Sequence, residues 1–362
     1  MRRSGAGHTG HGPGWWPALL LAMLCTVCGA AEFDRVVPGA ALQFPRDMGA
    51  HPGYRIEWWY VTGQLERDDG GPLGFQVTFF RVRNPDAESN PSRFSPKQLL
   101  FAHAALSDPS WGRLVHDQRS ARVLEGLVEA STSDTDVRID DWSLRREGRG
   151  YRARIAGEAF AFDLAIEPTQ APLPQGEGGF SRKGPDPRNA SYYYSEPQLR
   201  VTGRIEARGK ASAVRGVAWL DHEWSSEYIA AEAAGWDWLG ANLDDGAALM
   251  AFRMRGKDGG TLWSAATLRP SSGAPTYLSG SDVVFKPRRT WRSPQTGTDY
   301  PVDMEIRVRE RTWFVQPLMD DQEMDGRAST GTLSWEGAVR LSGAGSGRGY
   351  LELTGYSGRV AF

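Results

Sequence analysis

The stretch from Trp219 to Trp224 places three ionisable residues, Asp221, His222 and Glu223, side by side between two tryptophans. It reads as a β-strand, in which successive side chains point to opposite faces. Trp219, Asp221 and Glu223 are therefore expected on one face, and His222 and Trp224 on the other. The alternation predicts that Asp221 and His222 do not pair with each other.

Asp221 is the best candidate for a general acid. If Trp219 faces a barrel interior, Asp221 enters it as well, and burial among aromatic rings favours the neutral, proton-donating form of a carboxyl group. The structural alternative is that Asp221 or Glu223 forms an ion pair with an arginine such as Arg204 or Arg253. In that case the stretch would have a structural role and no catalytic one.

Two further segments, 54–65 and 235–243, carry large aromatic residues on both faces of the expected strands. Such strands fit positions where one face packs a core and the other lines an apolar cavity. His103 alternates within an apolar strand and is expected as a second polar cavity group or as a core histidine. The candidate ligand-binding residues are Trp219, Trp238, Trp59, Tyr194, Trp236, Glu57 and His103.

The apolar residues recur with period two in most of the chain, as in 75–83, 159–168 and 349–356, with Asp-Gly and Gly-Gly turn signals between them. The chain is therefore expected to be all-β. The segment 225–235 alone has a weak helical pattern and is expected as a short helix or helical connection. The long irregular segments 84–98 and 168–190 are candidate lids.

Two hairpins resemble each other. Each has an aromatic residue, a leucine five residues later, Asp-Asp-Gly and then Phe-Arg-x-Arg, with Tyr60 and Phe80 in the first and Trp238 and Phe252 in the second. The resemblance favours two similar barrels, although similar hairpins also recur in unrelated β proteins.

The N-terminus is expected to be a signal peptide over residues 1–30. Arg2 and Arg3 precede an apolar run, and small residues follow near Ala30. The expected domains are then 31–224 and 225–362, in a secreted protein that is expected in the periplasm. Lipoprotein anchoring is less favoured, because Leu24 and Val27 precede the two cysteines. No later segment is long and apolar enough to span a membrane.

The composition argues against several functions. The chain has 42 Lys and Arg against 44 Asp and Glu and no basic block, so nucleic acid is not an expected partner. Both cysteines lie in the predicted signal, and the few histidines show no metal-ligand spacing. Neither a metal nor another cofactor is expected, and no nucleophile elbow or phosphate-binding loop occurs.

Several segments together resemble the carotenoid 1,2-hydratase (hydroxyneurosporene synthase) family, most closely its secreted lipocalin-like branch, known as predicted secreted hydrolases. They include EWWYVTGQL, YYYSEPQLRVTGRI, GVAWLDHEWSS and GWDWLGANLDDGAALMAFRMR, in order along the chain. The resemblance implies two lipocalin-like β-barrels in tandem, with a hydrophobic ligand in or between them. It also implies addition of water across an isoprenoid double bond without a redox cofactor.

In this reading Asp221 is the acid of a hydratase, a hydro-lyase, and Glu57, Glu223 or His222 orients the water. Trp219, Trp238 and Tyr194 would stabilise the cation. The alternative implied by the resemblance is a non-catalytic lipid carrier that works with an ABC transporter of the lipoprotein-release type. A glycosidase that uses Asp221 and Glu223 is a third reading, but no sugar-binding pattern supports it.

Overall fold

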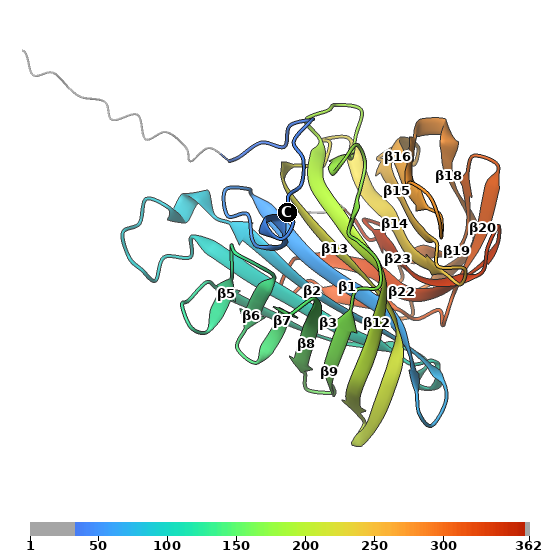
Figure 1. The fold of residues 1–362 in the computed structure, drawn as a ribbon, viewed down its shortest axis with the longest axis horizontal. Helices are drawn as coiled ribbons and strands as arrows, with labels where there is room; N and C mark the ends of the chain where they lie inside the picture. The colour runs from blue at the N-terminus through green and yellow to red at the C-terminus, as the bar shows by residue number, and fades with distance from the viewer. Residues whose placement is uncertain (1–32, 359–362) are drawn as a thin grey trace, which may run out of the picture. The chain divides into compact units, whose positions relative to one another are not determined.

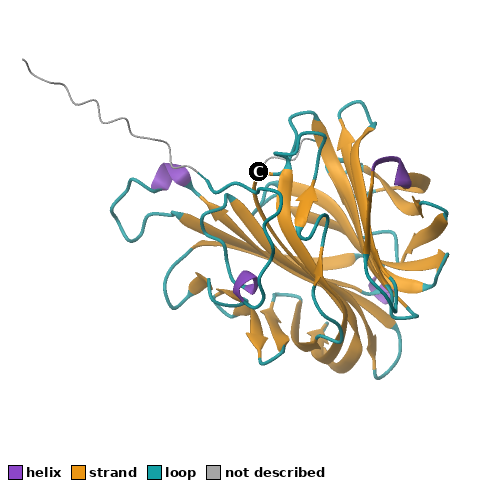
Figure 2. Ribbon diagram, turned by 45° about the horizontal axis from the view of Figure 1, so that its top comes forward, coloured by secondary structure: helices purple, strands orange, loops and turns teal. Residues whose placement is uncertain are grey.

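The structure, a computed structural model, describes residues 33–358, and the predicted signal peptide lies outside this range. The expected all-β fold is confirmed: two antiparallel sheets each curl into a barrel or half-barrel, as in tandem lipocalin-like barrels. Figures 1 and 2 show the strands of the two sheets, with only short helical turns between them. Among the described residues, no helix is long and apolar enough to cross a membrane.

The first sheet, blue to yellow-green in Figure 1, has 13 strands within the described residues. Its order is β4-β3-β2-β1-β13-β12-β9-β8-β7-β6-β5, and β10 and β11 add to β12. The strands are β1 (Ile56–Arg67), β2 (Pro72–Arg83), β3 (Gln98–Ser107), β4 (Leu114–Arg122), β5 (Val128–Ala130), β6 (Asp136–Ile139), β7 (Trp142–Glu147), β8 (Gly150–Ala156), β9 (Phe160–Glu167), β10 (Leu173–Pro174), β11 (Phe180–Arg182), β12 (Ala190–Ala207) and β13 (Lys210–Glu227).

The second sheet, yellow to red, has ten strands in the described range, in the order β17-β16-β15-β14-β23-β22-β20-β19-β18, with β21 on β22. They are β14 (Ala233–Leu243), β15 (Ala248–Gly256), β16 (Thr261–Arg269), β17 (Thr276–Ser279), β18 (Val283–Arg292), β19 (Asp299–Val308), β20 (Arg311–Pro317), β21 (Glu323–Gly326), β22 (Thr332–Gly343) and β23 (Gly347–Thr354). Four short 3-10 helices complete the described elements: η1 (Arg46–Met48), η2 (Pro85–Ala87), η3 (Pro109–Trp111) and η4 (Gly280–Asp282).

Within the described residues, period-two alternation produces three large apolar cores and one small cluster of Ala105, Leu114 and Met324. One fills the curl of the first sheet and includes Trp59, and a second fills the curl of the second sheet and includes Trp335. The third lies between the sheets and joins Tyr60, Trp219 and Trp238. Central strands of both sheets are therefore buried on both faces, which explains why their sequences are aromatic on both faces.

The structure differs from two expectations about local structure. The segment 225–235 is not helical: β13 continues to Glu227, a turn follows, and β14 begins at Ala233. Its alanines suit a helix, but pairing of Ser225 with Ile56 and of Ala233 with Gly256 satisfies the backbone in two sheets instead. The segment 168–190 is not structureless, because β10 and β11 lie along β12.

The repeated hairpin pattern corresponds to matching features in the two sheets. In the first, Glu57 on β1 lies opposite Arg81 on β2, and the two form a buried ion pair of 2.8 Å. In the second, Asp237 on β14 lies opposite Arg253 on β15, and these two also form an ion pair. Each sheet thus holds a carboxylate–arginine pair at the same place in its hairpin.

The strand register corrects the alignment of the aromatic residues. Trp58 lies opposite Phe80, and Trp238 lies opposite Phe252. Trp58, not Tyr60, is therefore the counterpart of Trp238. The sequence pattern matches Trp238 with Tyr60, two residues further along β1 than Trp58. The two hairpins differ in length, so matching their turns does not match their paired residues.

We expect Arg81→Met to lower the free energy of unfolding by about 3–5 kcal/mol, because it leaves the Glu57 carboxylate buried without its guanidinium partner. The measurement is urea unfolding near neutral pH. The matched control is Arg138→Met, which breaks an ion pair with Glu129 in which both side chains are about one-third exposed. Its loss should stay below about 1 kcal/mol, and equal losses in the two variants would contradict the interpretation.

Candidate functional site

A cavity of about 80 Å³ lies between the two sheets, at one side of the core that joins them. Strands β1, β2 and β13 of the first sheet and β14, β15, β22 and β23 of the second contribute its walls. Its aromatic lining consists of Trp58, Tyr60, Phe80, Tyr228, Trp236, Trp238 and Phe252. Its ionisable lining consists of Asp221, Glu223, Glu336, Glu352 and Lys183.

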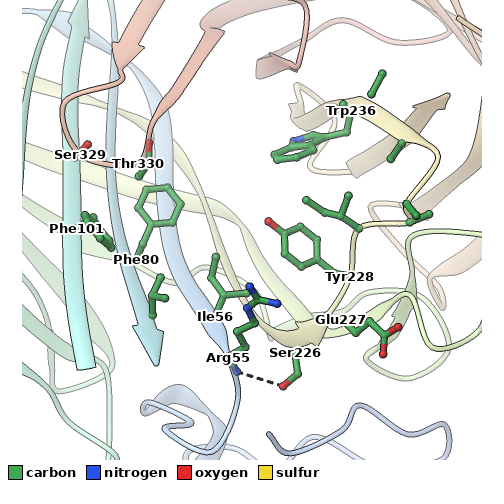
Figure 3. A pocket seen from close by; sticks show the side chains of 17 residues that line it. Arg55, Ile56, Phe80, Phe101, Ser226, Glu227, Tyr228, Trp236, Ser329 and Thr330 are labelled. Carbon is green, nitrogen blue, oxygen red and sulfur yellow. Dashed lines mark hydrogen bonds between the residues drawn. The ribbon is translucent and has the colours of Figure 1, made fainter. Parts of the chain in front are cut away.

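A larger cleft of about 400 Å³ adjoins this cavity. The two share the lining residues Ile56, Phe80, Tyr228 and Trp236. Figure 3 shows the rings of Phe80 and Tyr228 facing each other across the cleft, with Trp236 beside them. The cleft and the carboxyl-lined cavity therefore adjoin at a largely apolar wall.

Asp221 is 3% exposed on the cavity wall and accepts three hydrogen bonds. Oδ1 accepts from Ser195 Oγ and from Trp219 Nε1, both at 2.6 Å, and Oδ2 accepts from Tyr193 Oη at 2.8 Å. The Tyr193 hydroxyl in turn accepts from Trp238 Nε1 at 3.1 Å. Three neutral donors of the first sheet thus hold the carboxyl group, and Trp238 of the second sheet holds one of these donors in turn.

No basic residue in the described range forms an ion pair with Asp221, and Arg253 pairs with Asp237 instead. Burial raises the pKa of Asp221 to about 7, although its three hydrogen bonds work in the opposite direction. At neutral pH this carboxyl group is therefore protonated in a large part of the molecules, which is the state a general acid needs.

Glu223 lines the same cavity but has a cationic partner. Lys183 Nζ lies 2.7 Å from Glu223 Oε1, and the side chains of both residues are at most 6% exposed. The ammonium group also lies over the rings of Tyr193 and Phe252, at 4.6 and 4.8 Å from their centroids. Lys183 comes from the segment 168–190, which thereby contributes a cation to the cavity.

Glu336 and Glu352 form the opposite wall. They lie directly across from each other on β22 and β23. Burial raises the pKa of Glu336, and burial together with the charge of Glu336 raises the pKa of Glu352 to about 8. Like charges this close oppose each other, so protonation of one of the two is favoured.

The other face of β13 carries a different network. His222 Nε2 and His51 Nδ1 each lie 2.8 Å from Glu57 Oε1, and Arg81 Nε donates to Glu57 Oε2 at 2.8 Å. Burial disfavours a charged Glu57, but the two histidines and Arg81 outweigh this and hold its pKa well below the usual range. Burial lowers the pKa of His222. This network does not line the cavity.

His51, Glu57 and His222 could in principle hold a metal ion, because their ligand atoms lie within 4.8 Å of one another. Arg81 already bonds the carboxylate, and its Nη2 donates to the carbonyl oxygen of His51 at 2.9 Å. A second cation would have to displace or repel this guanidinium group. The donor set therefore suits a buried ion-pair network better than a metal site.

The remaining candidate residues lie away from the inner cavity. Trp59 stacks on His222, and Tyr194 Oη lies 3.3 Å from His222 Nδ1, both in the core of the first sheet. His103 Nε2 lies 2.7 Å from Ser329 Oγ, which lines the open cleft, and burial lowers the pKa of this histidine to about 4.

Of the candidate residues named from the sequence, the structure brings Asp221, Glu223, Trp236 and Trp238 together at one cavity, with Trp219 behind Asp221. Trp219 and Asp221 face the space between the sheets and not a barrel interior. Strand alternation predicted correctly that Asp221 and His222 point to opposite faces.

Sequence reasoning missed Glu336, Glu352 and Lys183. The two glutamates lie in the segments SWEGAV and YLELTG, where each is a lone carboxyl in an apolar strand. That signal could have marked both as buried acids. Lys183 lies in an irregular segment, where no pattern indicates burial.

The comparisons agree with this architecture. The AttH-like family model matches residues 35–356. A Nitrosomonas europaea protein assigned as an AttH is similar in structure, with 52% sequence identity, a TM-score of 0.85 and coverage of 90% of this chain and 99% of that one. No curated protein matches the chain.

Two solved structures share the fold at low identity. Kievitone hydratase from Nectria haematococca has 15% identity and a TM-score of 0.68, with coverage of 91% of this chain and 97% of that one. CghA in complex with Sch210972 has 13% identity and a TM-score of 0.51, with coverage of 91% and 98%. With its family model matched over residues 35–356, the chain belongs to the AttH-like family.

Proposed function

We propose that this protein binds a hydrophobic, unsaturated ligand between its two sheets and adds water to a C=C bond of that ligand, with Asp221 as the general acid. The ligand class would be isoprenoid or polyene-like, as in the carotenoid hydratases that the sequence resembles. The observation that carries the proposal is a buried carboxyl group on a cavity wall with neutral hydrogen-bond donors and no ion-pair partner among the described residues.

The dimensions of the site support a long apolar ligand. The inner cavity of about 80 Å³ has room for the end of a chain and not for a whole lipid. The adjoining cleft of about 400 Å³ is lined by Ile56, Val82, Phe101 and Ile229 and suits an extended hydrocarbon tail. A terminal double bond would then lie at the carboxyl groups, with the tail in the cleft.

The reaction balances without a redox partner. The π electrons of the double bond take the Asp221 proton, which forms a C–H bond and leaves a tertiary cation. The rings of Trp236 and Trp238 are placed to stabilise that charge. A water molecule then forms the C–O bond and loses a proton, which returns to the Asp221 carboxylate directly or through Glu223.

A non-catalytic carrier is the second candidate, and one observation favours it. Ser195, Trp219 and Tyr193 occupy both oxygens of Asp221 with good geometry. A carboxyl group bonded in this way can fix the position of β12 and β13 and leave the ligand unchanged. The carrier would be exported to the periplasm and deliver lipid to an ABC transporter of the lipoprotein-release type, which affinity capture from solubilised membranes would test.

The first test of the hydratase is native mass spectrometry and lipid extraction on the full protein purified from its own cells. We expect a co-purifying polyene or prenyl lipid to appear both as itself and heavier by one water. The heavier form should be absent from Asp221→Asn, because the amide cannot donate an acidic proton. An unmodified lipid held equally by both proteins would mean a carrier.

The protonation state of Asp221 gives a test without substrate. Because its pKa is raised to about 7, the folded chain binds this proton more tightly than the unfolded chain does. Its contribution to stability is full below about pH 4 and is lost as the pH rises to about 7. As the pH rises from 4 to 8, the free energy of unfolding of Asp221→Asn should therefore increase by about 2–4 kcal/mol relative to that of wild type, measured by urea unfolding.

Glu125→Gln is the control, since Glu125 is exposed and its removal should leave the pH profile unchanged. If the profiles of wild type and Asp221→Asn run parallel from pH 4 to pH 8, Asp221 is ionised in the folded protein. The general-acid role would then be wrong.

A further inference from the structure

The carboxyl pair on the second sheet has an arrangement that folding alone does not favour. Glu336 and Glu352 are directly opposite each other on neighbouring antiparallel strands. Like charges at such positions destabilise a sheet. Both side chains line the cavity, and Asp221 and Glu223 line it from β13 of the other sheet. Four carboxyl groups from two sheets thus converge on one small space.

Neutral donors hold the pair in place. Glu336 accepts from Ser334 Oγ at 2.6 Å and from Tyr60 Oη at 3.1 Å. Glu352 Oε1 accepts from Trp236 Nε1 at 2.8 Å and from Thr354 Oγ1 at 2.9 Å.

Nothing cationic neutralises the pair in the part of the chain that the structure describes, where neither glutamate forms an ion pair with a basic residue. Lys183, the cation of the cavity lining, is bound to Glu223 on the other sheet. The cavity therefore holds more potential negative charge than the protein itself compensates.

The rings around the pair suit a positive charge. Trp236 and Trp238 on β14, Phe252 on β15 and Trp58 on β1 line the same space. Aromatic faces combined with carboxylates bind organic cations, and they disfavour anions. The same arrangement would stabilise a carbocation that forms inside the cavity.

We propose that the Glu336–Glu352 pair determines the charge selectivity of this cavity, so that the site binds an amphiphile with a positively charged end and rejects an anionic lipid of the same length. The positive charge is an organic ammonium group at one end of the ligand. The inference rests on the proposed function only in placing the ligand in this cavity.

Proton release should accompany binding of a cation. The empty cavity keeps a proton on Glu352, whose pKa burial and Glu336 raise to about 8, and a cation in the cavity favours its loss. Affinity for a permanent cation should therefore rise about tenfold per pH unit below pH 8 and level off above it. The other titratable residues that line the cavity and the cleft are Asp221, Glu223, Lys183, Tyr60, Tyr228, Arg55 and Glu227. Tyr350, on the same strand as Glu352, also interacts with Glu336.

The experiment compares three probes of equal chain length on the full protein: octyltrimethylammonium, octanol and octanoate. Quenching of tryptophan fluorescence reports binding, because Trp58, Trp236 and Trp238 line the site. At pH 8 we expect the ammonium to bind at least about tenfold more tightly than octanol, and octanoate to bind most weakly. Octyltrimethylammonium carries its charge at every pH, so its pH profile reports the protein alone.

Variants of the two glutamates, compared with a variant of an exposed glutamate, show whether the pair itself causes the selectivity or the net charge of the protein does. Glu352→Gln should weaken ammonium binding about tenfold at pH 8, flatten its pH profile and leave octanol binding unchanged. Glu336→Gln should weaken ammonium binding as well and lower the pH at which affinity levels off, because it removes the neighbouring negative charge. Glu310→Gln, at an exposed turn of the second sheet, is the matched control and should change nothing.

Three results would overturn the proposal: a preference for octanoate, which would make Lys183 the anchor of the head group; equal binding of all three probes; or no binding of the ammonium at all. Failure of the hydratase is a separate outcome. If no hydrated lipid forms and ammonium selectivity persists, the proposed reaction is wrong and the charge selectivity holds. If hydrated lipid forms without selectivity for the ammonium, only the present inference is wrong.

Discussion

The organisation of this protein depends on one strand, β13, being buried on both of its faces. Its period-two alternation sends Asp221 and Glu223 into the space between the sheets and His222 into the core of the first sheet. A strand with one face in water could not keep both sets of ionisable groups dry. Packing of the second sheet against the first therefore creates the low-dielectric surroundings in which Asp221 holds its proton.

The two faces of β13 hold Glu57 and Asp221 in opposite ways. On the face toward the core of the first sheet, Glu57 bonds with Arg81 and two histidines. The result is a charge-compensated network in which the carboxylate is ionised. On the face toward the second sheet, Asp221 has only neutral hydrogen-bond donors. Compensated burial stabilises a fold at best modestly, whereas uncompensated burial changes protonation. A catalytic group is accordingly expected on the face of β13 that points toward the second sheet.

The alternation of residues was sufficient to predict the all-β class and the separation of Asp221 from His222. It did not identify which side of each strand faces a cavity, because both faces are aromatic and both are buried. Trp59 and Tyr194 satisfy the same pattern as Trp238, yet they pack in the core of the first sheet. Phase within one strand is local information, whereas the meeting of two sheets depends on contacts far apart in the sequence.

The residues that sequence reasoning missed also depend on contacts between the two sheets, which the pattern of a single strand does not contain. Glu336 and Glu352 belong to one cavity with Asp221 only because β22 and β23 of the second sheet pack toward β13 of the first. A single acid in an apolar strand has many explanations, and four acids around one space have few. Lys183 neutralises only Glu223, and aromatic rings line most of the remaining space. The least costly way to balance the other three carboxyl groups is therefore protonation in the empty site and a positive charge in the occupied one.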